Sequence, residues 1–250
     1  MKLNKYNLLY ILGAVALFFA YAWFPIVTHG TWNAPDEVAA VYFSEHIPLL
    51  GGDYELEATY ADELGGLVHP RSSVVVNGML TPSMWLGLPW LLKLVTSITG
   101  LDPSLAQLII PLLAVLAIAA WHEIVFAYTQ DRKLAVFTVI ALAVHPGWWY
   151  FTARGLHPNI MFVSMLIFAI YFWYVLANKR ITKRPDLWRE AMLLLGGLSV
   201  GMAIFARTNE LVWLLPVLLF VLWAKRKLPV RELAVAVIGL LIPIAIMFQL

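Results

Sequence analysis

Two adjacent carboxylates, Asp36 and Glu37, follow the first long apolar segment of the chain, in the sequence Trp-Asn-Ala-Pro-Asp-Glu. Such a pair could bind a metal ion, act as a general base or complement the dipole at the start of a helix. Pro35 suits a first helical turn, and apolar residues recur at helical spacing after the pair. The pair therefore marks either a helix start lying on a membrane surface or a site with a catalytic base or a metal ligand.

Two arginines, Arg154 and Arg207, each stand at the end of an apolar segment. A guanidinium group matches the oxygens of a phosphate in a bidentate way, so these side chains could clamp a phosphate. Alternatively, each could reach along its helix to lipid headgroups, as long basic side chains do at membrane surfaces. The arginines are therefore candidates for substrate binding, with lipid anchoring as the simpler role.

Further polar residues near the ends of the apolar segments could also contact a substrate: His69, Arg71, His157, Asn159 and Glu210. Histidines close to carboxylates could form a metal site, and the possible ligands are Asp36, Glu37 and His69. The loose spacing of these residues leaves the metal site open. No cofactor is expected apart from a possible divalent metal ion.

The composition defines the elements that must position these residues. The chain has 250 residues, of which 62% are hydrophobic and 13% are charged, whereas soluble domains have about 25% charged residues. Several apolar stretches reach the roughly 20 residues that a membrane span needs. Lipid offers no hydrogen bonds to the backbone, so the spans must be helices. We expect an all-α, multi-pass transmembrane helical bundle. The absence of cysteine excludes disulfides and thiolate metal sites.

The apolar runs predict spans at 6–28, 103–129, 134–152, 159–178, 190–206, 209–224 and 232–250. An eighth run, 81–99, is short and contains two prolines and a lysine. If it does not cross the membrane, 13 of the 17 Lys and Arg residues fall on one side. Basic residues mark the cytoplasmic side. We therefore expect 81–99 to lie along the outer interface or to re-enter, inside an outer loop over about 29–102 that carries interfacial helices.

With this topology, the candidate residues named above all fall on the outer side of the cell membrane. Their convergence on one face favours an active site there. The acidic stretch between Asp53 and Glu63 lacks the glycine of a calcium loop, and we expect a solvated loop. The chain ends at Gln249-Leu250 within an apolar run. We therefore expect residues 1–250 to be one transmembrane domain, truncated at its C-terminus.

In this arrangement the chain resembles the integral-membrane glycosyltransferases of the GT-C fold, within the protein O-mannosyltransferase and aminoarabinose transferase superfamily. Three motifs carry the resemblance: Pro-Asp-Glu in the first outer loop, Arg154-Gly-Leu-His-Pro-Asn before a span, and Gly201-Met-Ala-Ile-Phe-Ala-Arg207-Thr-Asn at the end of another. It covers essentially all 250 residues. The chain departs from the family pattern at Val68-His69-Pro70-Arg71, which has no acid, and at His157, where many members have Asp.

The resemblance implies transfer of a sugar from a polyprenyl-phosphate carrier to an acceptor on the outer face. Asp36 is then the essential carboxylate that deprotonates the acceptor, and Glu37 orients Asp36 or the acceptor. Arg154 and Arg207 meet the charge of the leaving phosphate. The expected partners are the polyprenyl-phosphate-linked sugar, the lipid bilayer and an acceptor of open identity, and no nucleic acid. The alternative is a transporter or flippase for a lipid-linked or anionic solute, although transporters place ionisable residues near the bilayer midplane.

Overall fold

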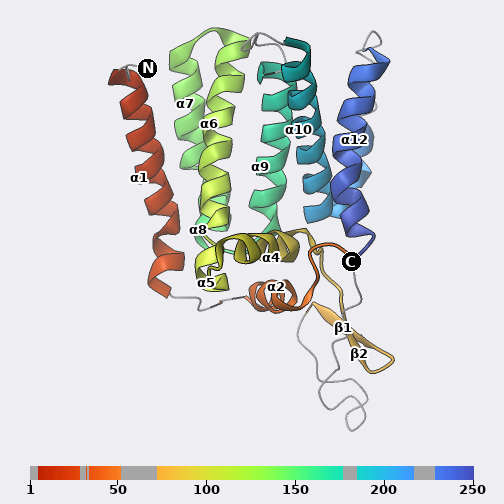
Figure 1. Cartoon of the computed structure of the whole chain (residues 1–250). Helices are drawn as coiled ribbons and strands as arrows, with labels where there is room; N and C mark the ends of the chain where they lie inside the picture. Colours follow the sequence, from red (N-terminus) through yellow and green to blue (C-terminus); the bar gives the residue numbers. More distant parts are fainter. Residues whose placement is uncertain (1–4, 29–31, 33, 52–71, 177–184, 217–228) are drawn as a thin grey trace.

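The computed structural model describes residues 5–28, 32, 34–51, 72–176, 185–216 and 229–250. A bundle of roughly parallel helices is covered at one end by a layer of short helices and a hairpin (Figure 1). The bundle contains α1 (Lys5–Thr28), α6 (Ile109–Thr129), α7 (Arg132–Ala143), α9 (Pro158–Ile170), α10 (Pro185–Ala206) and α12 (Val230–Met247). The all-α class predicted from the sequence is confirmed.

Five helical segments among the described residues are long and apolar enough to cross a membrane. They are Leu8–Thr28, Pro103–Thr129, Pro158–Leu176, Asp186–Ala206 and Val230–Met247. A sixth span results if α7 and α8 (Pro146–Ala153), which meet at 56°, are counted as one broken span. These segments correspond to six of the predicted spans, and the second half of the remaining one, 209–224, lies outside the described residues.

Prolines mark the starts of five helices in the described part of the chain, as their fixed φ and missing N–H favour. They begin α2 (Pro35–His46), α5 (Pro103–Ala106), α8, α9 and α10. Two of these starts, at Pro35 and Pro158, place the predicted site residues Asp36 and Asn159 in the first turn of a helix. A π-helix, η1 (Tyr171–Leu176), continues α9, and the short 3₁₀ helix η2 (Thr208–Glu210) follows α10.

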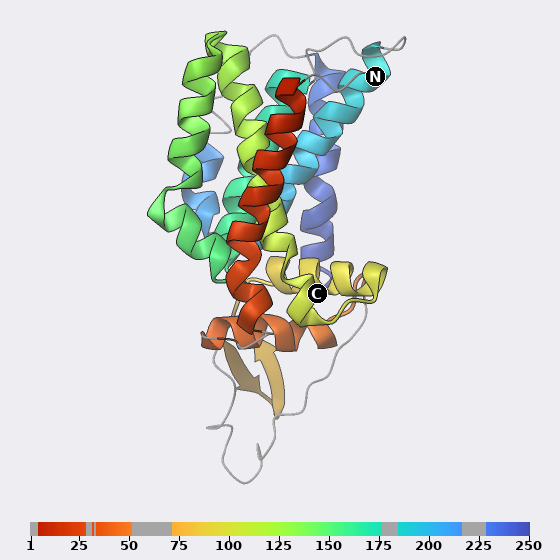
Figure 2. The same ribbon diagram turned by 90° about the vertical axis from the view of Figure 1, so that its left-hand side faces the viewer.

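The covering layer consists of α2, α4 (Gly87–Thr99), α5 and the hairpin, and we call this side the α2 end of the bundle (Figures 1 and 2). Both views show α4 lying across the ends of the long helices. With 13 residues, α4 is also shorter than a membrane span. The structure thus agrees with the prediction that 81–99 does not cross. The α6–α7 connection lies at the opposite end (Figure 1).

One element was not predicted. Residues 73–82 form an antiparallel hairpin of β1 (Ser73–Val76) and β2 (Met79–Pro82), within the outer loop that was expected to carry interfacial helices. Its turn residues Asn77 and Gly78 have φ of 52° and 80°, as a type I′ turn requires. Three consecutive valines before Asn-Gly are a hairpin signal, because β-branched residues favour strands and this dipeptide favours the turn.

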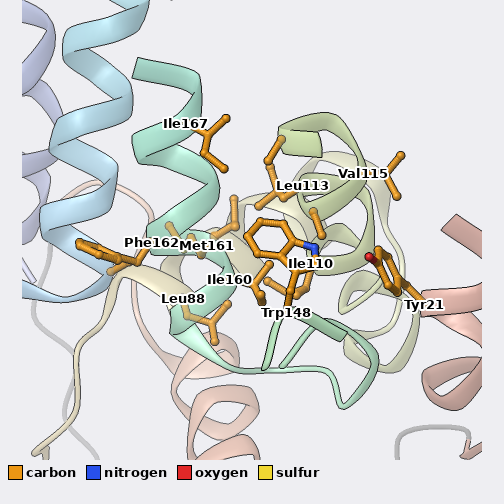
Figure 3. Close-up of a cluster of buried hydrophobic side chains, with 14 of the residues drawn as sticks. Tyr21, Leu88, Ile110, Leu113, Val115, Trp148, Ile160, Met161, Phe162 and Ile167 are labelled. Carbon is orange, nitrogen blue, oxygen red and sulfur yellow. The ribbon is translucent and has the colours of Figure 1, made fainter. Parts of the chain in front are cut away.

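The covering layer is packed tightly onto the bundle. Leu88 of α4 is buried in the main apolar core with Ile110, Trp148 and Met161 (Figure 3). The neighbouring Gly87 lies so close to the end of α10 that a Cβ there would be 2.5 Å from the Phe205 carbonyl carbon. Since real Cβ atoms do not approach a backbone this closely, α4 is fixed against α10, next to the candidate residue Arg207.

Candidate functional site

The two adjacent carboxylates lie in different environments at the first turn of α2. Asp36 is exposed, and its Oδ1 accepts a hydrogen bond of 2.7 Å from the Ser72 hydroxyl, one residue before β1. Glu37 is only 2% exposed, and its Oε2 accepts a hydrogen bond of 3.0 Å from the backbone N–H of Ala34. This bond satisfies one of the free amides at the helix start. The Asp36 side chain is therefore exposed to solvent, whereas Glu37 faces the protein.

His157 contacts the buried carboxylate from the other side. As the N-cap residue of α9, it places its Nε2 3.7 Å from Glu37 Oε1. Its ring packs edge-on against Phe151, with 5.3 Å between the ring centres, and stacks more loosely on Tyr150. The contact joins two segments that are far apart in the sequence. Both Glu37 and His157 were predicted site residues.

Three charged candidate residues, Glu37, Asp36 and Arg154, affect the pKa of His157. Burial lowers the pKa of the His157 imidazole below its ordinary value of 6.5, the carboxylates of Glu37 and Asp36 partly offset this, and the Arg154 guanidinium lowers it further. The ring is therefore neutral at neutral pH. Asp36, Glu37, Arg154 and His157 form one electrostatic group, which we call the acidic cluster.

Arg154 is exposed at the C-terminal end of α8. Its guanidinium lies over the rings of Phe24 and Tyr150, 5.2 Å and 5.5 Å from their centres. Such cation–π contacts hold the group in place while leaving its N–H donors available. No carboxylate within the described ranges forms an ion pair with Arg154. An anion could therefore bind it without displacing an acid.

Arg207 forms a second group, the arginine cluster, with predicted site residues Asn159 and Glu210. One of its terminal nitrogens donates to Asn159 Oδ1, and the other lies 2.8 Å from Glu210 Oε1. Glu210 also accepts a hydrogen bond from the indole N–H of Trp213. Both arms of the Arg207 fork are therefore occupied, unlike those of Arg154.

The start of α9 belongs to both clusters, because His157 faces Glu37 and Asn159 contacts Arg207. It also carries the positive end of the helix dipole. Sequence reasoning did not identify Ser72, Phe24, Tyr150 or Trp213 as neighbours of the site. None of them stands in a recognisable motif, and only the packing of distant segments brings them there.

The proposed metal site is only partly covered by the structure. His69 and Arg71 lie outside the described residues, as does the acidic stretch 53–63. Within the described ranges, no three His, Asp or Glu residues lie close enough together to hold a metal ion. Of the carboxylates suggested as ligands, Asp36 is exposed and could take part in binding a cation. Glu37 is turned toward His157.

Comparison with known proteins identifies the family. Residues 83–248, well over half of the chain, match the family model of dolichyl-phosphate-mannose-protein mannosyltransferases. No curated protein and no solved structure matches the chain. The matched range contains Arg154, His157 and Arg207. Asp36 and Glu37 precede it, and Glu37 contacts it through His157. The resemblance to GT-C glycosyltransferases is thereby confirmed, and the chain belongs to the dolichyl-phosphate-mannose-protein mannosyltransferase family.

Proposed function

We propose that the protein transfers a sugar from a polyprenyl-phosphate carrier to an acceptor hydroxyl at the α2 end of the bundle, which faces the outside of the cell membrane. Family membership indicates a membrane glycosyltransferase of the polyprenyl-phosphate-sugar type. The bilayer would supply the carrier, whose apolar chain can lie between or beside the spans. Family membership also favours a transferase over a transporter or flippase.

The observation that supports this proposal best is that an exposed carboxylate and an exposed arginine lie near the same histidine. Asp36 and Arg154 both act on His157, and neither is buried. A base and a phosphate-binding group are the two parts that this transfer needs. Asp36 removes the proton of the acceptor hydroxyl, and the resulting oxygen attacks the anomeric carbon. The bond between that carbon and the phosphate oxygen breaks, and the polyprenyl phosphate leaves as an anion without needing a proton.

The leaving phosphate is assigned first to Arg154. Its guanidinium is oriented by Phe24 and Tyr150 and can form two charge-assisted hydrogen bonds with phosphate oxygens. Arg207 would have to give up Asn159 or Glu210 before doing the same. The arginine cluster is instead suited to hold the starts of α9 and η2 beside the donor. His69 and Arg71 stay candidates for substrate contact.

The proposed orientation rests on charge. The ion pairs of α10 with α12 lie near the starts of both helices, where Arg189 contacts Glu232 at 2.8 Å and Arg231 contacts Glu190 at 2.6 Å. These starts, like the α6–α7 connection with Arg132, lie at the end of the bundle opposite α2 (Figure 1). An excess of basic residues favours the cytoplasmic side. The α2 end is then outside.

The test is the Asp36→Asn variant, which keeps the size of the side chain and removes its basicity. The purified full chain is given a polyprenyl-phosphate sugar with peptide, glycan and lipid acceptors, and the transferred product is measured. General-base catalysis contributes about 10²–10⁴-fold, so kcat should fall by about that factor. Glu45→Gln, an exposed acid on the same helix, serves as the control and should transfer normally. Normal transfer by Asp36→Asn would remove Asp36 from the mechanism.

A further inference from the structure

We infer that Glu37 is a positioning residue and that, with His157, Gln107 and Gly155, it fixes the first turn of α2 so that Asp36 faces the acceptor. The inference rests on the proposed function of Asp36 as the base. The family resemblance implies that Glu37 orients Asp36 or the acceptor, and the contacts of Glu37 favour the first of these roles. The inference also gives a role to Gln107 and Gly155, which were not among the predicted site residues.

The contacts of Glu37 leave no room for a role in proton transfer. The side chain is 2% exposed, one carboxylate oxygen accepts the Ala34 N–H, and the other faces the His157 ring. A base must come within hydrogen-bond reach of the hydroxyl that it deprotonates. Glu37 is instead enclosed by the protein, where a carboxylate is costly unless it has partners.

Gly155, in the loop before His157, lies between Glu37 and a third segment that contains Gln107. Its φ of +101° is a conformation that favours glycine. A Cβ there would stand 2.9 Å from Gln107 Oε1 and 3.9 Å from Glu37 Oε1. The Gln107 side chain is buried, and its amide donates a hydrogen bond of 2.7 Å to the Ser104 carbonyl, which fixes its orientation. The backbone of Gly155 thus lies close to both Gln107 and Glu37.

Helix geometry connects this arrangement to Asp36. Neighbouring residues in an α-helix point about 100° apart, so a turn that directs Glu37 into the protein must direct Asp36 elsewhere. The observed direction is toward solvent and the Ser72 hydroxyl. If the contacts of Glu37 are lost, the first turn of α2 can rotate or fray, and Asp36 loses its position. The Arg154 guanidinium lies over Phe24 and Tyr150 and does not contact Glu37, so donor binding should be retained when Glu37 is replaced.

The test compares three variants with Asp36→Asn in the same transfer assay. Glu37→Gln keeps the volume and an oxygen that can accept the Ala34 N–H, as glutamine does at this helical position. It should retain kcat to within about tenfold, far above the 10²–10⁴-fold loss expected without the base. Glu37→Ala and His157→Asn should each lower kcat more than Glu37→Gln, and the KM for the donor should change little in Glu37→Ala. In the double variant Glu37→Ala/His157→Asn, the loss of kcat should be smaller than the two single losses combined, because both substitutions remove the same contact.

A second measurement does not depend on activity. Backbone amide exchange in the first turn of α2 should be faster in Glu37→Ala and His157→Asn than in the parent protein, and unchanged in Glu45→Gln. If Glu37→Gln is as inactive as Asp36→Asn, the positioning role is wrong while the proposed function stands. Unchanged amide exchange in both Glu37→Ala and His157→Asn would also contradict the positioning role. If Asp36→Asn transfers normally, the proposed function fails, whatever the exchange data show.

Discussion

Arg207 and Glu210 form an ion pair of 2.8 Å at the end of α10, so one of the two arginines predicted to bind phosphate already holds a carboxylate. Its other arm donates to Asn159. Arg154 has aromatic rings as its neighbours instead. Two residues of the same type, each at the end of a span, thus have different neighbours. Arg154 has no carboxylate partner in the described part of the chain, whereas Arg207 connects three segments.

The Arg154→Lys variant should lower kcat/KM for the lipid-linked sugar by about tenfold or more. Lysine keeps the charge but loses the planar fork and its fit over Phe24 and Tyr150. Hydrogen bonds to charged groups contribute roughly 1.5–3 kcal/mol each. Initial rates at several donor concentrations measure the effect, with Arg189→Lys at the opposite end of the bundle as the control. Parent-like kinetics would leave Arg154 as a lipid anchor only.

The Arg207→Lys variant should affect stability more than Arg154→Lys does. A lysine cannot donate in two directions with the same geometry, so either Asn159 or Glu210 loses its partner. Leaving a partly buried polar group unpaired costs about 1–3 kcal/mol. Thermal unfolding of both variants in the same detergent provides the comparison. Equal unfolding temperatures for the two would show that the arginine cluster does not support the fold.

The Gly155→Ala variant should be destabilised and lose transfer activity. At φ +101° an L-residue is strained, which costs about 1–3 kcal/mol, and the new methyl group would stand 2.9 Å from Gln107 Oε1. Gly13→Ala in α1 is the matched control, because no atom lies within 4 Å of a Cβ there and alanine favours the helix. Unfolding temperature and kcat are measured for both. A Gly155→Ala protein as stable as Gly13→Ala would show that this loop adapts freely.

The stability of the protein should fall as the pH decreases below about 6.5. Because burial lowers the pKa of His157 in the folded state, the unfolded chain takes up a proton at a pH where the folded chain does not. Unfolding is then favoured as the pH drops from 6.5 toward the lower folded pKa, and this contribution vanishes above that window. Unfolding temperatures between pH 7.5 and 5 test this. His157→Gln should flatten the curve, whereas His46→Gln, at the exposed end of α2, should not.

Local signals predicted much of the fold. Pro35 indicated a helix start, and the distribution of basic residues indicated that 81–99 does not cross. The hairpin was missed because the outer loop was expected to carry interfacial helices and a solvated acidic stretch, although Asn77-Gly78 is a strong turn signal.

The site itself was only partly predictable. The sequence indicates Asp36 and Glu37 as a pair of candidates. It does not show which of them is buried, because that depends on the segments that pack against α2. Phe24 and Arg154 are 130 positions apart, and no spacing rule connects them. Short motifs therefore predicted the residue types of the site, and tertiary packing determined their roles.

The last prediction concerns the orientation of the bundle. The chain has no cysteine, so single cysteines can be introduced at Thr99, the last residue of α4, and at Gln130, the C-cap of α6. Both positions are exposed, and they lie at opposite ends of the bundle (Figure 1). In intact cells an impermeant thiol reagent should label Thr99→Cys, while Gln130→Cys should react only after the membrane is permeabilised. Labelling of Gln130→Cys alone from outside would place α2 and Asp36 in the cytoplasm and overturn the proposed orientation. Labelling of both from outside would contradict the span formed by α6, because its two ends must lie on opposite sides of the bilayer.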